Sequence, residues 1–400
     1  MQILNQPFDG QLGNYLKENL NKDYDCFTFF SAFAKNSGVL RLKPYIEKFK
    51  QRGGYVEGFI GVDSGGTSYE AVLNLLDLCN NLYIIHSEQQ NTTYHSKIYL
   101  FSSKKNNWLT IGSNNFTGGG LWTNFETSIC LEYDNSDIDK FLNIYKLIET
   151  YKNTEYKCSK LLSSKEDIDL LLKYKYLYPE VQLKIASKSK KTYEQDSELQ
   201  KIFGTQKGIA IPSLTNHKKT AKESITTKHP ISASDTSEYM WVESKALTGG
   251  SRNILDLSKR GRIIESSREG YPYIVTDPNF IRGSITFFDI EPDSTDCEKI
   301  VTINYEGIDY NNCVIKFPVG DKSNKSWRIQ LKGISSSGTT LHRVNGPDWL
   351  CNKILVFEKI QTDYYSLSVL SEKELEHIMS NSKVVATNGN AKASKKFGFM

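Results

Sequence analysis

A short window of the chain gathers side chains that suit chemistry on a phosphate group. His95 and Lys97 lie two residues apart in a run, 94–101, whose composition predicts a β-strand. Side chains alternate along a strand, so both are expected on one face. The imidazole can act as nucleophile or general acid, and the ammonium can neutralise a developing negative charge. The pair therefore predicts a site that handles an oxyanion.

The residues that follow extend this set. A second strand is predicted at 108–111, and it runs into a turn of small and amide residues, GSNN at 112–115. Backbone N–H groups of such a turn are expected to point inward toward an anion. A third predicted strand, 126–133, begins with Glu126, whose carboxylate is expected to orient the imidazole. The predicted catalytic residues are His95, Lys97, Ser113, Asn115 and Glu126.

The pattern H-x-K followed by G-S-x-N-x-T resembles the signature of the phospholipase D superfamily, and a glutamate at the place of Glu126 is typical of its nuclease branch. A core histidine beside a surface lysine is the alternative for His95 alone, but it does not account for the whole set. A second H-x-K, at 217–219, has neither a strand nor a following G-S-x-N. The matching residues are His95, Lys97, Gly112, Ser113, Asn115 and Thr117.

The sequence departs from the family pattern in two ways. Many members carry an aspartate after the H-x-K, and Ser102 stands in that place here. The family active site also needs two motifs that face each other, whereas this chain has one. The resemblance therefore implies a homodimer with one active site across its two-fold axis.

Composition sets the broad class. At 400 residues, 38% of them hydrophobic, the chain is expected to form about two or three domains with apolar cores. A net charge of +4 is a weak signal, so nucleic-acid contact must come from local clusters. The seven cysteines show no zinc-ligand spacing, so we expect thiols in a reducing compartment, no metal and no cofactor. Without a signal-peptide pattern or an apolar run near roughly 20 residues, a cytoplasmic protein with no membrane span is expected.

Strands alternate with helical stretches in the first part of the chain, which predicts an α/β fold with a mixed sheet flanked by helices. Ligands of such sheets bind beyond the strand ends, where the 112–115 turn would lie. Between a strand and a helix, Gly65, Gly66 and Thr67 form either a plain turn or a lining for a DNA strand. Further strands are predicted at 24–33, 55–62 and 82–86, and helices at 11–21, 42–52, 68–78, 138–151 and 164–176.

A change of composition separates this part from the rest. We expect a phospholipase D-like catalytic and dimerisation domain over 1–180, a basic linker over 181–235 and a mainly-β domain over 236–400 with a polar, mobile tail from 381. The linker is either solvated or in contact with DNA phosphates. Strands are predicted at 239–243, 263–264, 284–289, 299–305, 313–319, 326–332 and 353–359, and a helix at 371–379.

Two loops of the β-rich domain, 248–262 and 321–328, concentrate Arg, Lys, Ser and Asn, which contact bases and phosphates in DNA. Ordinary polar turns are the alternative. On the stretches 241–257 and 324–331, this domain is similar, more weakly, to the DNA-binding pseudobarrel of plant B-three-type transcription factors and some restriction enzymes. DNA contacts are expected from Arg252, Asn253, Lys322, Asn324, Lys325 and Arg328.

The two resemblances together imply a metal-independent type II site-specific deoxyribonuclease, a homodimer through its N-terminal domain that acts on double-stranded DNA. One His95 would attack phosphorus to form a phosphohistidine, and His95 of the second copy would protonate the leaving oxygen and then activate water. Lys97, Ser113 and Asn115 would stabilise the oxyanion. Whether a companion methyltransferase and an ATP-dependent helicase or translocase take part stays open.

Two alternatives remain at this point. One is a lipid or other phosphodiesterase of the same superfamily, disfavoured by the single motif and by the basic loops of the β-rich domain. The other is a DNA-binding regulator with a decayed nuclease domain, disfavoured because every residue of the His95 set is present.

Overall fold

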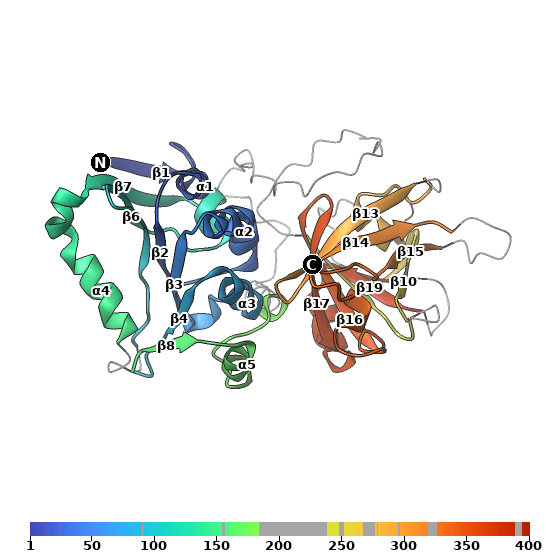
Figure 1. Cartoon of the computed structure of the whole chain (residues 1–400). Coiled ribbons are helices and arrows are strands. Elements are labelled where there is room, and N and C mark those ends of the chain that lie inside the picture. The colour runs from blue at the N-terminus through green and yellow to red at the C-terminus, as the bar shows by residue number, and fades with distance from the viewer. Residues whose placement is uncertain are drawn as a thin grey trace, which may run out of the picture. The chain divides into compact units, whose positions relative to one another are not determined.

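The computed structural model describes residues 1–89, 91–153, 157–183, 238–247, 252–266, 277, 279–294, 297–318, 326–388 and 394–400. The chain divides into two compact units, and each is described by itself (Figure 1). The described part of unit 1 ends at Leu183, and that of unit 2 begins at Glu238. Apart from 181–183, the predicted linker therefore lies outside the described residues.

Unit 1 is built on a mixed sheet whose eight strands lie in the order β1-β7-β6-β5-β2-β3-β4-β8. The pairs β2–β3 and β3–β4 are parallel, and the other pairs are antiparallel. Aromatic and β-branched residues fill the central strands, as a sheet covered on both faces requires. The strands are β1 (Gln2–Gln6), β2 (Cys26–Ser31), β3 (Tyr55–Gly61), β4 (Asn81–Ile85), β5 (Lys97–Ser102), β6 (Asn106–Gly112), β7 (Glu126–Asp134) and β8 (Ser159–Leu162).

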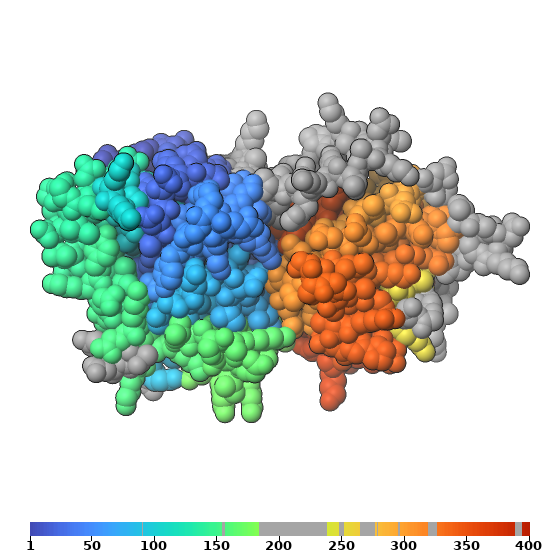
Figure 2. Space-filling model, viewed as in Figure 1, coloured from blue at the N-terminus to red at the C-terminus, as the bar shows by residue number. Residues whose placement is uncertain are grey.

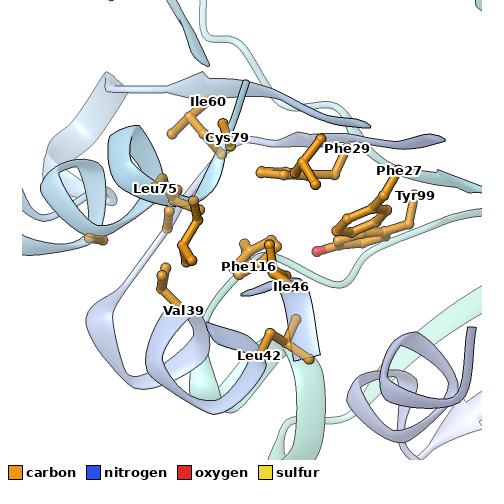
Figure 3. Close-up of a cluster of buried hydrophobic side chains, with 14 of the residues drawn as sticks. Phe27, Phe29, Val39, Leu42, Ile46, Ile60, Leu75, Cys79, Tyr99 and Phe116 are labelled. Atoms are coloured by element: carbon orange, nitrogen blue, oxygen red, sulfur yellow. The ribbon is translucent and has the colours of Figure 1, made fainter. Parts of the chain in front are cut away.

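Helices cover the two faces of this sheet unequally. Three long helices, α1 to α3, lie on one side and α4 on the other (Figure 1). Alternation along β2 serves both layers: Phe29 packs in the large cluster beneath α2 and α3 (Figure 3), and Phe30 packs in a smaller cluster with Ile148 of α4. The helices are α1 (Leu12–Asn21), α2 (Asn36–Gln51), α3 (Tyr69–Leu78), α4 (Leu142–Lys152) and α5 (Lys165–Lys173), with short η1 (Asp63–Gly65), η2 (Gly119–Thr123) and η3 (Asn135–Phe141).

The predicted α/β class of unit 1 is confirmed, and three of its elements begin well away from the predicted residue. α2 begins at Asn36, earlier than the predicted 42, and contains Pro44. The predicted helix 138–151 starts as the 3-10 helix η3 and becomes α-helical at Leu142. The predicted strand 94–101 begins only at Lys97, because the N–H of Tyr94 donates to the Asp63 carboxylate at 2.7 Å instead of to a neighbouring strand.

Unit 2 is mainly β, as predicted: eleven strands form one sheet in the order β10-β15-β14-β13-β17-β16-β9-β19-β18-β11-β12. Among these pairs only β13–β17 is parallel. Whether the sheet is a pseudobarrel stays a prediction. The elements are β9 (Glu238–Glu243), β10 (Ile254–Leu257), β11 (Arg260–Ser266), β12 (Phe280–Arg282), β13 (Glu298–Tyr305), β14 (Ile308–Lys316), β15 (Trp327–Gln330), β16 (Lys353–Gln361), β17 (Tyr364–Ser371), β18 (Val384–Thr387) and β19 (Lys396–Phe399), with η5 (Ser284–Phe288), η6 (Leu341–Arg343), η7 (Glu372–Glu374) and α7 (Leu375–Ser380).

Two predictions for unit 2 are wrong. The predicted strand 284–289 is the 3-10 helix η5. Polar and apolar residues alternate over 284–287 as they would in a strand, but all residues of η5 are buried, so this alternation does not mark an exposed and a buried face. The tail predicted to be mobile from 381 contributes β18 and β19 to the sheet. Phe397 and Phe399 of β19 are buried in the core, and Gly398 between them passes so close to Trp241 that a Cβ would lie 2.6 Å from its ring nitrogen.

Candidate active site

The predicted catalytic residues lie at one edge of the unit 1 sheet. The parallel strands β2, β3 and β4 end at this edge, and the antiparallel strands β5 and β7 begin there. The register sets the first residue of β5, Lys97, opposite Ser31 at the end of β2. It also sets Gly112 at the end of β6 opposite Ser128, and Glu126 at the start of β7 opposite Gln6.

His95 and Lys97 are in contact, although they do not share a strand. Lys97 is buried, with 6% of its surface exposed, whereas His95 is exposed just before β5. The Lys97 Nζ lies 2.7 Å from His95 Nδ1 and donates to the His95 carbonyl oxygen at 2.9 Å. An ammonium only donates, so Nδ1 accepts and the neutral ring carries its proton on Nε2. In that form, Nε2 can donate a hydrogen bond to a phosphate oxygen.

Glu126 does not orient the imidazole within one chain, contrary to the prediction. Its carboxylate accepts a short hydrogen bond from the Ser113 hydroxyl and another from Asn124 Nδ2 at 3.2 Å. The Ser113 hydroxyl also accepts from the N–H of Thr127 at 3.1 Å. Because β6 and β7 are neighbours, Ser113 at the end of one strand meets Glu126 at the start of the other, and the pair joins the strand ends beside Lys97.

Asn115 presents an amide donor. Its Oδ1 accepts from the N–H of Phe33 at 3.2 Å, which fixes the side chain. Within the described part of the chain, its Nδ2 has no hydrogen-bond partner, so this group can donate to a substrate oxygen. Phe33 also meets His95 edge-on, with 6.0 Å between ring centroids. Phe33, which lies just beyond β2, therefore contacts both His95 and Asn115.

Backbone N–H groups in and just after the GSNN turn are partly engaged inside the protein. The N–H of Ser113 donates to Thr127 O at 3.1 Å, and that of Phe116 donates to the Ser31 hydroxyl at 2.8 Å. Asn114 is buried and donates from Nδ2 to Gly120 O at 2.7 Å. The turn continues the sheet and starts η2, and the N–H groups of Ser113 and Phe116 are used inside the protein. The N–H groups of Asn114 and Asn115 have no hydrogen-bond partner among the described residues, so their contact with an anion stays a prediction.

The hydroxyl groups of Thr117 and Thr67 are engaged inside the protein. The Thr117 hydroxyl accepts from the N–H of Gly120 at 2.9 Å, at the start of η2. Thr67 is fully buried; its hydroxyl donates to Gly61 O at 2.5 Å and accepts from the N–H of Ala34 at 3.1 Å. A DNA strand cannot reach Thr67, so the predicted lining role of this residue is wrong. Gly65 and Gly66 are half-buried, and for them both alternatives stay open.

The electrostatics of the site centre on Lys97. Burial lowers the pKa of its ammonium, and the Glu126 carboxylate opposes that change. A partly desolvated cation interacts more strongly with an anionic oxygen than a fully hydrated one does. The arrangement can therefore bind a phosphate oxygen, stabilise added negative charge and move a proton at His95.

Two residues that the sequence analysis did not select also lie at this edge. Asp63 follows β3 and His86 follows β4, and their side chains meet at 2.5 Å between Asp63 Oδ1 and His86 Nδ1. Their position in the sequence could have indicated them, because both are polar residues that come just after buried parallel strands.

The described residues that are predicted to contact DNA differ in their solvent exposure. Arg252 is exposed in the left-handed region, φ 49°, with its Nε 3.9 Å from an Asp348 carboxylate oxygen. Asn253 is buried, and its backbone carbonyl oxygen accepts from the N–H of Leu331 at 2.8 Å. Its side chain is therefore not exposed to DNA, and its predicted DNA contact is wrong. Arg328 lies in β15, in register with Asp256 of β10. The other three, Lys322, Asn324 and Lys325, lie outside the described residues.

The described residues contain neither a cluster of metal ligands nor a membrane-spanning helix. Among them, no group of His, Cys, Asp and Glu has the arrangement of a metal site. No helix in the same ranges is long and apolar enough to cross a bilayer.

Comparison with known proteins gives structural similarity alone, since neither a protein-family model nor a curated protein matches the chain. Nuc, a phospholipase D family member from Salmonella typhimurium, is 16% identical with a TM-score of 0.30, over 41% of this chain and 97% of its own. NucT from Helicobacter pylori is 15% identical with a TM-score of 0.29, over 36% and 92%. Phosphatidylserine synthase from Haemophilus influenzae is 14% identical with a TM-score of 0.28, over 41% and 42%. This structural similarity falls in the N-terminal part of the chain and says nothing about its substrate.

Proposed function

We propose that this chain is a sequence-specific endonuclease that hydrolyses DNA phosphodiester bonds without a metal ion, at an active site shared by two copies. The observation that carries the proposal is the contact of 2.7 Å between Lys97 Nζ and His95 Nδ1, at the sheet edge where Asn115 presents its amide. Phosphoryl transfer needs a group that moves protons and fixed positive charge on the phosphate oxygens, and this set offers both.

One such set is half of what the reaction needs. In-line displacement places the attacking and leaving groups on opposite sides of phosphorus, so one imidazole cannot serve both. The chain carries a single H-x-K with a following G-S-x-N, and a second copy related by two-fold symmetry supplies the other imidazole.

An exposed apolar surface beside the half-site favours this pairing. Ile3, Ile129 and Ile111 lie in register across β1, β7 and β6, and each is at least 43% exposed. Phe8 and Phe125 are also exposed and stack with 5.5 Å between ring centroids. We call these five residues the apolar ladder. Ile111 directly precedes the Gly112-Ser113 turn and Phe125 directly precedes Glu126, so a second copy seated here lies next to the half-site.

The proposed reaction has two steps. His95 of one copy, with its proton on Nδ1, attacks phosphorus through the Nε2 lone pair. An N–P bond forms, and the P–O bond to the leaving sugar oxygen breaks as the imidazolium of His95 of the second copy protonates that oxygen and becomes neutral. Water, deprotonated by this second His95, then attacks phosphorus and breaks the N–P bond. Both Lys97 ammonium groups and both Asn115 amides stabilise the pentacovalent oxyanion.

Sequence selection is assigned to unit 2. Its mainly-β fold and the exposed Arg252 support the assignment, together with Lys322 and Lys325 in the stretch 319–325, which lies outside the described residues. Digestion of a plasmid library in EDTA, with and without ATP, followed by sequencing of the ends, tests both parts. Ends that share one sequence motif are expected; loss of cleavage on chelation contradicts the proposed chemistry.

A mixing experiment tests the shared site. Wild type and His95→Ala are unfolded together and refolded at varied ratios, and cleavage is measured at constant total protein. If each site needs both imidazoles, activity follows the square of the wild-type fraction. A linear dependence means that each copy carries its own complete site and contradicts the shared arrangement.

A further inference from the structure

Asp63 links two strand ends to the segment that carries His95. It is buried, with 7% of its surface exposed, in η1 directly after β3. Its Oδ1 lies 2.5 Å from Nδ1 of His86, which directly follows β4. Its Oδ2 accepts from the N–H of Tyr94 at 2.7 Å. Both carboxylate oxygens are therefore engaged, one by an imidazole and one by the backbone just before His95.

Tyr94 is held from its other side by packing. Its ring is buried and meets Tyr151 of α4 edge-on, with 5.7 Å between centroids. Gly61 makes room for this ring, because a Cβ at that position would lie 2.7 Å from it. With its N–H on Asp63 and its ring in the core, Tyr94 has little freedom to move. His95 is the next residue, so its backbone position is set by these contacts.

An outer layer of polar contacts fixes His86 in turn. Its Nε2 lies 3.6 Å from a Glu88 carboxylate oxygen, and its ring meets Tyr176 edge-on with 5.1 Å between centroids. The Tyr176 hydroxyl donates to the other Glu88 oxygen at 2.5 Å. The side chain of His86 is 28% exposed, so the imidazole sits between an inner and an outer carboxylate.

We infer that Asp63 and His86 are a positioning pair that holds His95 in reach of Lys97 and of the scissile phosphate. The inference rests on the proposed function of the His95 site. Residues 86–96, where described, form neither helix nor strand, so no regular hydrogen-bond ladder holds His95. Displacement of a reacting group by about 1 Å can lower the rate on the order of 100-fold, which makes this support matter for the reaction.

The test uses bis(p-nitrophenyl) phosphate in EDTA as substrate, since this diester needs no recognition sequence. For His86→Ala we expect kcat to fall roughly 10- to 100-fold with KM within about twofold of wild type, because binding groups remain and alignment is lost. His86→Asn should recover most of the rate, because its Nδ2–H can replace the Nδ1–H that faces Asp63. His377→Ala, at an exposed histidine of α7 in unit 2, is the matched control and should be unchanged.

Amide hydrogen exchange of the peptide spanning 91–97 gives a readout independent of catalysis. Loss of the Tyr94–Asp63 contact in Asp63→Ala should speed this exchange, and His86→Ala should do the same. If exchange is faster in both variants but the wild-type protein does not cleave the diester, the proposed function is refuted and the positioning pair is retained. Unchanged exchange, or a rise in KM with normal kcat, overturns the positioning pair. Equal loss in His86→Ala and His86→Asn also overturns it.

Discussion

Replacement of Lys97 by methionine separates the catalytic from the structural contribution of one buried side chain. Methionine keeps an unbranched shape of similar length and removes the charge. The substitution removes the contacts of Nζ with His95 Nδ1 and O, at 2.7 and 2.9 Å, and the cation beside the Ser113–Glu126 pair. Activity and stability are expected to respond in different directions.

The expected loss of activity follows from oxyanion stabilisation. Removal of one fixed donor lowers kcat on the order of 10²- to 10³-fold, or about 2.7–4 kcal/mol. A site shared by two copies loses both ammonium groups, so the loss should be at least about 10²-fold and reach roughly 10⁴-fold or more if the two act independently. KM should change less, because most binding contacts remain.

The expected change in stability has the opposite sign. Burial lowers the pKa of Lys97 in the folded protein, so at neutral pH the folded state holds a cation that its surroundings disfavour. Methionine has no such charge to desolvate, and the free energy of unfolding should stay level or rise. For the wild type, activity should fall as the pH rises through this lowered pKa, since the cation is then lost.

The assay compares Lys97→Met with Lys17→Met on bis(p-nitrophenyl) phosphate in EDTA, alongside urea unfolding of both. Lys17 is a second buried lysine of unit 1, in α1 over the rings of Trp122 and Tyr45, away from the catalytic set. The control should keep wild-type activity. Activity of Lys97→Met within about fivefold of wild type would refute the role of Lys97 in charge stabilisation.

Three more predictions follow from the packing and charge of the two units. Burial, and to a smaller extent Arg41, lowers the pKa of Lys17 in the folded protein to about 8, below its value in the unfolded chain. The free energy of unfolding should therefore rise between pH 8 and 10. Urea titrations at both pH values should show this rise in wild type and not in Lys17→Met. Ile129→Asp puts a charge in the apolar ladder and should yield monomers without activity in analytical ultracentrifugation and cleavage assays, whereas active dimers would contradict the proposed interface. Phe397→Ala opens a cavity in the core of unit 2 and should destabilise it by about 3–5 kcal/mol in urea unfolding monitored by tryptophan fluorescence, and a change below about 1 kcal/mol would contradict the packing of β19.

Features that depend on residues close together in the sequence could be predicted. Side-chain types and spacing selected His95, Lys97, Ser113 and Asn115, and the structure brings their strand ends to one edge of the sheet. The alternation of predicted strands and helices, followed by a change of composition, distinguished an α/β part from a mainly-β part. The partner of Glu126 within one chain could not be predicted in this way. Glu126 meets Ser113 and not His95, because its partner depends on which strands are neighbours, and sequence spacing does not encode this.

Features that depend on distant residues could not be predicted. Asp63 acts on Tyr94 through the packing of β3 beside β4 and the loop after it, and no short motif joins them. The strand β19 looked like a polar tail, since only Phe397 and Phe399 are large and apolar there. Its pairing with β9, far away in the sequence, gives those rings their burial.

The position of β19 within its sheet has a consequence for folding. It lies between β9 and β18, and the strand order gives no other connection between the larger part of the sheet and the group β18-β11-β12. Until β19 docks, β9 and β18 each present an open edge of unpaired N–H and carbonyl groups, which is a template for aggregation. Refolding yield of unit 2 should therefore fall with protein concentration, and a peptide that copies 394–400 should compete for the gap.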